Sequence, residues 1–281
     1  VAALLRANNE EPPLVVRANR LKTDRAALIE KFTAAGIAAA PAPHAPEAIR
    51  LRGAAAVERL PGFDDGLFFV QGEASQLIGF LLAPRPGERI LDAAAAPGGK
   101  ATHLAELMDD AGEIVALDIS ARGIERLKQN IGRLGLKSVQ PVRADAGLEL
   151  TGAAALPYDR ILADLPCTGL GTLRSHPEAK WRREEADAPR LARLQEKILG
   201  RAAAYLKPGG VLVYSTCTLT AEENERVVED FLNRHEAFTL ENAADFLPAG
   251  ARQMTRGKYF FALPHRDSTD GFFAARLRKR A

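Results

Sequence analysis

The feature of this sequence that most restricts its fold is the regular alternation of strand and helix patterns after residue 88. Short apolar runs typical of buried strands occupy residues 90–93, 114–117, 139–142, 160–163 and 211–214. Helical patterns lie between them, notably over residues 121–134 and 189–206. Because parallel strands need long crossover connections, this order predicts an α/β fold with a doubly wound, mostly parallel sheet. Such sheets bind ligands beyond the carboxyl ends of their strands.

The N-terminal part of the chain is organised differently. Residues 14–19, 48–51 and 67–70 are short β-prone runs, and Thr23 is placed to cap a helix that continues to Gly36. We therefore expect a small α+β domain over residues 1–72, followed by a second domain over 73–281 that opens with a helix at 73–82. The chain begins at Val1 rather than Met, and residues 1–13 are typical of the end of a preceding segment, so we expect a fragment of a longer protein or a trimmed one.

Composition excludes several classes of protein. The chain has 281 residues, of which 47% are hydrophobic, as is ordinary for a globular protein. Its two cysteines are too few for a disulfide framework, and no Cys or His cluster has zinc spacing, so we expect reduced thiols, a cytoplasmic protein and no metal. No apolar run approaches the roughly 18 residues of a transmembrane helix, and no signal-peptide pattern is present, so we expect no membrane association.

The strongest local signal follows the first strand of the alternating region. This loop consists of Ala94, Ala95, Ala96, Pro97, Gly98, Gly99 and Lys100. Glycines allow the backbone to pass close to a ligand, and the helix that follows presents unpaired N–H groups. The loop matches neither the phosphate-binding pattern G-x-x-x-x-G-K-[ST] nor G-x-G-x-x-G. It predicts a different ligand-binding loop, with an ordinary glycine-rich turn as the alternative.

Acidic residues come at or just after the ends of successive predicted strands. They are Asp92, Asp118, Asp145 and Asp164. We expect Asp118 to accept hydrogen bonds from the two hydroxyls of a ribose and Asp145 to meet the exocyclic amine of an adenine. Each acid alone could equally be a helix cap. Together they predict a binding site for a nucleoside along one edge of the sheet.

Both cysteines fall at this same edge, where Cys167 follows the fourth strand and Cys217 follows the fifth. A buried cysteine is commonly a small hydrophobic residue, but two of them beside a predicted nucleoside site favour a chemical role. Because the thiolate is the reacting form, neighbouring positive charge would activate such a residue.

Several motifs jointly resemble those of the RNA cytosine-5 methyltransferase family. They are residues 92–100, D-L-P-C at 164–167, R-S-H-P-E-A-K-W at 174–181, S-T-C at 215–217 and D-G-F-F at 270–273. The resemblance covers nearly the whole chain and is nearest to members that act on 16S ribosomal RNA. It implies a Rossmann-like fold with a seven-stranded, mostly parallel sheet, S-adenosylmethionine as the cofactor, and carbon 5 of a cytosine in RNA as the methyl acceptor.

The resemblance also implies a role for individual residues. Cys217 is the nucleophile, Cys167 assists release of the product, and Asp164 stabilises the cytosine as it reacts. The cofactor contacts are Ala94, Ala95, Ala96, Pro97, Gly98, Gly99, Lys100, Asp118, Asp145 and Asp164. We expect a monomer whose partner is RNA, with the small N-terminal domain contributing to RNA binding.

The sequence departs from the family pattern at three positions. The family often has Cys at the position of Ala94, Ala at the position of Leu165, and Ser at the position of Thr168. Leu165 is the bulkier residue and could alter the cytosine pocket. No counterpart is found in this chain for the N-terminal helical domain, similar to the NusB antitermination factor, that the ribosomal members carry.

Three other functions remain open. The same reaction could occur on transfer RNA or at another ribosomal position. A DNA cytosine methyltransferase would use Cys167 as its nucleophile and would have no need of Cys217. A non-catalytic RNA-binding assembly factor is the third possibility, although the intact set of Asp164, Cys167 and Cys217 argues against it.

Basic residues form two groups that we expect to contact RNA phosphates. The first group is Arg174, Lys180, Arg182, Arg183, Arg190 and Arg193, and the second is Arg276, Arg278, Lys279 and Arg280. A solvated helix face is the alternative for the first group, above all for Arg190 and Arg193. Within the first group, Trp181 could stack on a base or pack the loop, and packing is the favoured interpretation.

Overall fold

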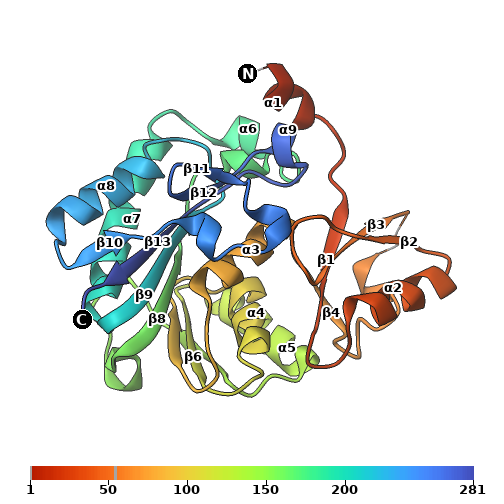
Figure 1. The fold of residues 1–281 in the computed structure, drawn as a ribbon, viewed down its shortest axis with the longest axis horizontal. Coiled ribbons are helices and arrows are strands. Elements are labelled where there is room, and N and C mark those ends of the chain that lie inside the picture. The colour runs from red at the N-terminus through yellow and green to blue at the C-terminus, as the bar shows by residue number, and fades with distance from the viewer. Residues whose placement is uncertain (1, 54–55) are drawn as a thin grey trace.

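A computed structural model describes residues 2–53 and 56–281, which form a small N-terminal unit packed beside a larger α/β unit (Figure 1). In the small unit, strands β1 (Leu14–Ala18), β2 (Ala38–Pro41), β3 (Ala48–Arg52) and β4 (Phe68–Val70) form an antiparallel sheet in the order β2-β3-β1-β4. Helix α2 (Arg25–Ala34) buries Leu28 and Phe32 against this sheet. A short helix α1 (Ala2–Ala7) precedes it.

Two expectations for this unit need correction. The helix is capped by Asp24 rather than Thr23, because the Asp24 carboxylate accepts the N–H of Ala27 at 2.9 Å while its own backbone is extended. Strand β2 was not expected, since an alanine run ending in Pro41 carries little β signal. It forms through antiparallel pairing with β3.

The large sheet is built around five parallel strands in the order β9-β8-β5-β6-β7. Their bounds are β5 Arg89–Asp92, β6 Glu113–Asp118, β7 Val139–Arg143, β8 Tyr158–Asp164 and β9 Leu206–Thr216. The chain runs outward from β5 to β7 and then returns to β8, so the switch point lies between β5 and β8. A ligand site is expected at that point, and Asp92 and Asp164 end the two strands that flank it.

Antiparallel strands extend the sheet beyond β9. They are β10 (Phe238–Leu240), β11 (Thr255–Arg256), β12 (Tyr259–Ala262) and β13 (Phe272–Lys279). The predicted fold class is confirmed, but within residues 2–53 and 56–281 the sheet has nine strands rather than seven. The difference arises because the short strands β10 and β11 add to the edge formed by β13 and β12.

Helices cover both faces of the sheet (Figure 1). On one face lie α3 (Glu73–Leu82), α4 (Gly99–Leu107) and α5 (Ala121–Leu134), and on the other lie α7 (Asp187–Ala204) and α8 (Glu225–Arg234). Successive strand residues alternate between the two cores, as Ile90 and Leu91 do. The short helices α6 (Ala179–Arg182) and α9 (Pro264–Asp267) lie in connections.

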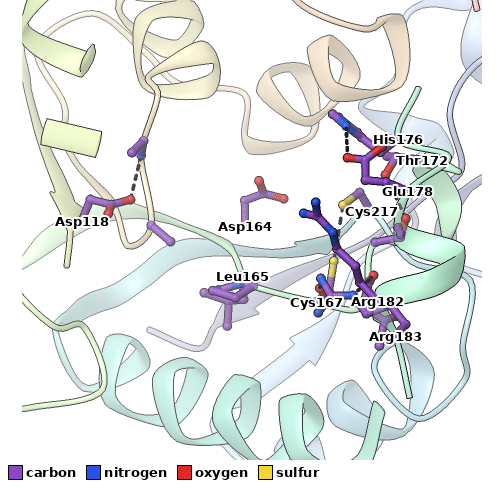
Figure 2. Close-up of a pocket in the computed structure, with 16 residues that line it drawn as sticks. Asp118, Asp164, Leu165, Cys167, Thr172, His176, Glu178, Arg182, Arg183 and Cys217 are labelled. Carbon is purple, nitrogen blue, oxygen red and sulfur yellow. Dashed lines mark hydrogen bonds and ion pairs between the residues drawn. The ribbon is translucent and has the colours of Figure 1, made fainter. Parts of the chain in front are cut away.

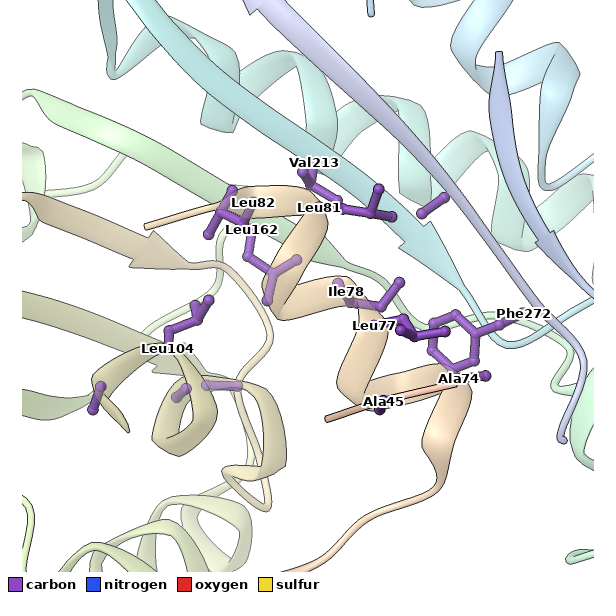
Figure 3. Packing of buried hydrophobic residues seen from close by; sticks show 14 of the residues in the cluster. Ala45, Ala74, Leu77, Ile78, Leu81, Leu82, Leu104, Leu162, Val213 and Phe272 are labelled. Carbon is purple, nitrogen blue, oxygen red and sulfur yellow. The ribbon is translucent and has the colours of Figure 1, made fainter. Parts of the chain in front are cut away.

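Helix α3 joins the two units. Its apolar side chains are fully buried against the sheet and α4 (Figure 3), and they are Leu77, Ile78, Leu81 and Leu82. Burial of such an aliphatic side chain contributes about 1.5–3 kcal/mol. At its first turn, the Glu73 carboxylate accepts the N–H of Ala45 at 3.1 Å and pairs with Arg50 at 3.0 Å. The small unit is therefore held to the helix by polar as well as apolar contacts.

Candidate active site

The glycine-containing loop lies between the ends of β5 and β6. The Ala96 N–H donates to Asp118 Oδ2 at 3.0 Å, and the Ala95 N–H donates to the carbonyl of Leu117 at 2.7 Å. Gly98 has a φ of +109°, and a Cβ there would lie 2.6 Å from Leu127 Cδ1. A side chain at this position would therefore be both strained and crowded.

A fully buried arginine of the small unit holds the other end of this loop. Arg17 donates to the Gly99 carbonyl at 2.7 Å, to Thr102 Oγ1 at 3.1 Å and to Glu106 Oε1 at 2.6 Å. It also donates to the side-chain oxygen of Gln71. Both members of the Arg17–Glu106 pair have fully buried side chains. The contact was not expected, because Gly99, Thr102 and Glu106 are more than 80 residues from Arg17 and no local pattern marks them.

Carboxylates and one lysine meet at the switch point. Lys100 Nζ lies 2.6 Å from Asp164 Oδ2, while Ser215 donates to Asp164 Oδ1 at 2.7 Å. Burial acts to lower the pKa of Lys100, but the neighbouring carboxylates of Asp164 and Asp92 outweigh it, and the pKa is raised. Burial, together with the Asp164 carboxylate, raises the pKa of Asp92 to about 7. Neither side-chain oxygen of Asp92 has a hydrogen-bond partner within the described residues.

Two cavities open at this edge of the sheet. The larger, of about 600 Å³, is lined by Asp118 at one side, Asp164 in the middle and both cysteines at the other (Figure 2). The smaller, of about 220 Å³, is lined by Asp92, Lys100 and part of the small unit. Ala94, Ala96 and Asp164 line both cavities, so the two adjoin one another.

The two thiols are in direct contact, with the Sγ atoms of Cys167 and Cys217 3.4 Å apart. The hydrogen bond with Cys167 lowers the pKa of Cys217, and the Lys100 ammonium acts in the same direction. The same hydrogen bond, together with burial, raises the pKa of Cys167 well above its usual value. Either sulfur could donate the hydrogen bond between the two thiols, and the Lys100 ammonium favours the thiolate form of Cys217.

A buried polar network behind the cysteines fixes their two loops. Glu223 accepts the N–H of Thr168 at 2.9 Å, and the Thr168 hydroxyl lies 2.7 Å from that of Thr218. Gln195 adds a hydrogen bond to Glu223 at 3.1 Å. Thr168 follows Cys167 and Thr218 follows Cys217, so this network couples the positions of the two thiols. Glu223 was not among the expected site residues, because the motifs named above do not include it.

The remaining predicted cofactor contacts are placed as follows. Asp118 lines the larger cavity and also accepts the N–H of Ser120 at 2.8 Å. Asp145 follows β7 and accepts the N–H of Gly147 at 2.8 Å, and it does not line either of the two cavities. Leu165 is 4% exposed and belongs to the buried apolar cluster on the α7 side of the sheet, although it also lines the larger cavity.

The first basic group divides in the structure. Arg182 and Arg183 line the larger cavity, and Arg183 donates to the Thr168 carbonyl at 2.7 Å. In contrast, the Arg174 side chain is 9% exposed and donates to the Glu11 carbonyl at 3.1 Å, so it is not a free phosphate contact. Arg190 pairs with Asp187 on the exposed face of α7, as the alternative interpretation expected.

The C-terminal basic group lies at the opposite edge of the sheet. Strand β13 is antiparallel to β9, with Phe273 opposite Thr216 and Arg278 opposite Val211, so the chain runs away from the cysteines. Arg276 is 2% exposed and pairs with Glu241 at 2.7 Å. Arg276 is therefore not available to RNA, and the group as a whole lies away from the catalytic loop, while contact of Arg278, Lys279 and Arg280 with RNA stays a prediction. The packing interpretation of Trp181 is wrong, because its side chain is 89% exposed.

Within residues 2–53 and 56–281, no helix is long and apolar enough to cross a membrane. The same residues contain no group of three or more His, Cys, Asp or Glu side chains that could hold a metal ion.

Comparison with known proteins identifies relatives along the whole chain. Residues 79–278 match the family model described as 16S rRNA methyltransferase RsmB/F, and residues 1–58 match that of the RsmF/B-like ferredoxin-like domain. The ribosomal RNA small subunit methyltransferase B of Yersinia pseudotuberculosis is 40% identical over 277 residues, which are 99% of this chain and 62% of that protein. The chain thus spans less than two thirds of the length of the curated relatives it matches.

Solved structures agree with this relationship. A methyltransferase homolog protein from Pyrococcus horikoshii superposes with a TM-score of 0.82 at 31% identity, over 99% of this chain and 90% of that one. NSun6 from the same organism, solved with SFG, gives a TM-score of 0.87 at 26% identity, over 100% and 94%. By its family match and its identity to these relatives, the chain belongs to the RsmB/F family of 16S rRNA methyltransferases.

Proposed function

We propose that this chain transfers a methyl group from S-adenosylmethionine to carbon 5 of a cytosine in RNA, with Cys217 as the nucleophile. The curated relatives are named for the small-subunit ribosomal RNA, which makes 16S ribosomal RNA the first substrate to test. We further propose that residues 1–72 form a domain that contributes to RNA binding and that residues 73–281 form the catalytic domain. The protein is proposed to be cytoplasmic and monomeric.

The charge around the cavities fits the proposed cofactor. S-adenosylmethionine carries a sulfonium and an ammonium group, whereas a nucleotide carries phosphates. Asp92, Asp118 and Asp164 line the two adjoining cavities, and the Asp92 carboxylate is buried without a partner among the described residues. A buried, unpaired carboxylate is costly unless a ligand group satisfies it. NSun6 of Pyrococcus horikoshii was solved with SFG, an analogue of S-adenosylmethionine, which supports the same choice.

The chain would divide the work on a bound cofactor among these acids. Asp118, which already accepts the Ala96 N–H, would accept hydrogen bonds from the ribose, and Asp92 would lie nearest the positively charged end. When bound, S-adenosylmethionine supplies an electrophilic methyl group. Asp145 would accept a hydrogen bond from the exocyclic amine of the adenine. For this contact the adenine would have to extend from the larger cavity to the turn after β7, where Asp145 lies.

Cys217 would perform the covalent step. Carbon 5 of cytosine is a poor nucleophile, but addition of the Cys217 thiolate to carbon 6 forms a C–S bond and makes carbon 5 enamine-like. Carbon 5 would then accept the methyl group as the S–CH3 bond of the sulfonium breaks and S-adenosylhomocysteine leaves. A base would remove the carbon-5 proton, and elimination would break the bond between Cys217 and carbon 6 to restore the thiolate. The lowered pKa of Cys217 favours the reactive form at the start of this sequence.

Asp164 and Cys167 would assist at the two ends of the reaction. Asp164 is held by Lys100 and Ser215, so its carboxylate is fixed where it can meet the N3 and N4 edge of the cytosine. Cys167 lies 3.4 Å from the Cys217 sulfur, which suits a role in the elimination that releases the product. Lys100 would keep the local charge balanced as the base becomes more negative.

The single observation that carries the proposal is the contact between the two thiols in a cavity that also contains Asp118 and Asp164. The DNA-type alternative needs Cys167 as the nucleophile, whereas the Lys100 ammonium favours ionisation of Cys217. A non-catalytic assembly factor would have no need for an ionisable thiol in an acid-lined cavity.

The direct test is methyl transfer in vitro. Purified protein, radiolabelled S-adenosylmethionine and unmodified 16S ribosomal RNA should give labelled 5-methylcytidine, detected by nucleoside mass spectrometry. Transfer RNA and 23S ribosomal RNA serve as competing substrates, and labelling of one of these alone would move the substrate assignment. Labelling of a base other than cytosine would overturn the proposed chemistry.

A further inference from the structure

We propose that Trp181 is a stacking platform for an unpaired base of the RNA that neighbours the target cytosine. The inference rests on the proposed function, because it requires an RNA substrate in the larger cavity. It assigns to Trp181 a part in substrate recognition that is separate from the chemistry at Cys217.

The exposure of Trp181 is the first observation. It is the only tryptophan in the sequence, and its side chain is 89% exposed. Tryptophan is highly buried on average and is enriched at interfaces, so an exposed indole marks a candidate contact for a partner. At 89% exposure, Trp181 packs little against the described residues.

The position of Trp181 is the second observation. It lies in the four-residue helix α6, whose first and last residues, Ala179 and Arg182, line the larger cavity. Arg183 lines it as well and bonds the carbonyls of the Cys167 loop (Figure 2). Lys180, on the other side of Trp181, donates to the Asn9 side chain at 3.0 Å. The turn is therefore anchored on both sides at the rim of the cavity, while the indole itself is exposed.

The chemistry of the surroundings selects the partner. An aromatic side chain next to Arg182 and Arg183 combines a π-face with positive charge, the pair that single-stranded nucleic acid uses for bases and phosphates. A cytosine can reach Cys217 only after it leaves its base stack, and this leaves the neighbouring base without a stacking partner. Trp181 would replace that lost partner at the entrance of the cavity.

The only tryptophan also gives a direct readout. A single-stranded RNA of about ten nucleotides with one cytosine should quench the fluorescence of the wild-type protein on binding, because a stacked indole is quenched by the base. The same RNA with abasic nucleotides on both sides of the cytosine should bind without the quenching. Equal quenching by the two RNAs would overturn the proposal.

Variants separate stacking from folding and chemistry. Trp181→Ala should weaken RNA binding by about 5- to 150-fold, and Trp181→Phe should retain part of it, since stacking contributes about 1–3 kcal/mol per base. The matched control is Leu156→Ala, another exposed apolar side chain, which precedes β8 at the opposite edge of the sheet and should change nothing. Unchanged affinity and unchanged KM for RNA in Trp181→Ala would refute the inference.

The failure of this inference can be told from failure of the proposed function. If the wild type methylates RNA and Trp181→Ala does so with the same KM, only the stacking role is lost. If the wild type methylates no RNA, the proposed function fails, and the stacking role fails with it.

Discussion

Replacement of Arg17 by methionine should destabilise the protein by about 3–5 kcal/mol, the usual cost of removing one partner of a buried ion pair. The structure supports this magnitude because the Arg17 and Glu106 side chains are both fully buried, at 2.6 Å from one another. The substitution leaves the Glu106 carboxylate, the Gly99 carbonyl and the Thr102 hydroxyl without the guanidinium. Methionine fills similar space, so the loss is mainly electrostatic.

The effect can be measured by urea unfolding of the wild type, Arg17→Met, and a double variant that also carries Glu106→Leu. Because removal of both charges leaves neither member of the pair as an unpaired buried ion, the double variant should recover most of the lost stability. Binding of S-adenosylhomocysteine should remain weaker in the double variant, since the Gly99 carbonyl still lacks its donor. An Arg17→Met protein with the wild-type midpoint and slope would refute the reasoning.

Three further predictions follow from the site. Asp118→Ala should weaken S-adenosylmethionine binding by about 1.5–3 kcal/mol, and calorimetry that gives wild-type affinity would remove Asp118 from the cofactor site. Asp92 has a pKa raised from 3.8 to about 7, so the apo protein should lose stability on the order of 4 kcal/mol as the pH rises from about 4 to 7. Asp92→Asn should flatten that dependence in urea unfolding, and an equal slope in both proteins would show that Asp92 is not its source. Arg182→Glu should remove one phosphate contact and so reduce the slope of log affinity for RNA against log salt concentration by about one. An unchanged slope would place the RNA elsewhere.

Much of the large unit could be predicted from sequence because its signals are local. Helix α5 (Ala121–Leu134) has the expected bounds, as its Ser120 cap and Gly135 stop are both adjacent in the chain. Asp92, Asp118 and Asp164 end three parallel strands as expected. Because the three strands are parallel, their carboxyl ends, and with them the three carboxylates, lie at the same edge of the sheet.

What could not be predicted depends on contacts between distant segments. The direction of β13, which carries Arg276 away from the cysteines, is set by its pairing with β9 rather than by local pattern. The contact of Arg17 with Gly99 joins two units and has no sequence signature. The exposure of Trp181 follows from how α6 sits on the rim of the cavity, whereas hydrophobicity alone favoured packing.

The central claim is that Cys217 attacks the cytosine and that Cys167 acts later, and covalent trapping separates the two steps. Cys167→Ala should accumulate a protein–RNA adduct that survives denaturing electrophoresis, because the C–S bond forms but is not resolved. Adding Cys217→Ala to that variant should abolish the adduct.

The most direct measurement is therefore adduct formation by the wild type, Cys167→Ala, Cys217→Ala and the double variant, each incubated with unmodified 16S ribosomal RNA and S-adenosylmethionine. The account predicts a stable adduct in Cys167→Ala alone, and no methylation in either variant that lacks Cys217. An adduct that persists in Cys217→Ala and disappears in Cys167→Ala would contradict the assignment and make Cys167 the nucleophile.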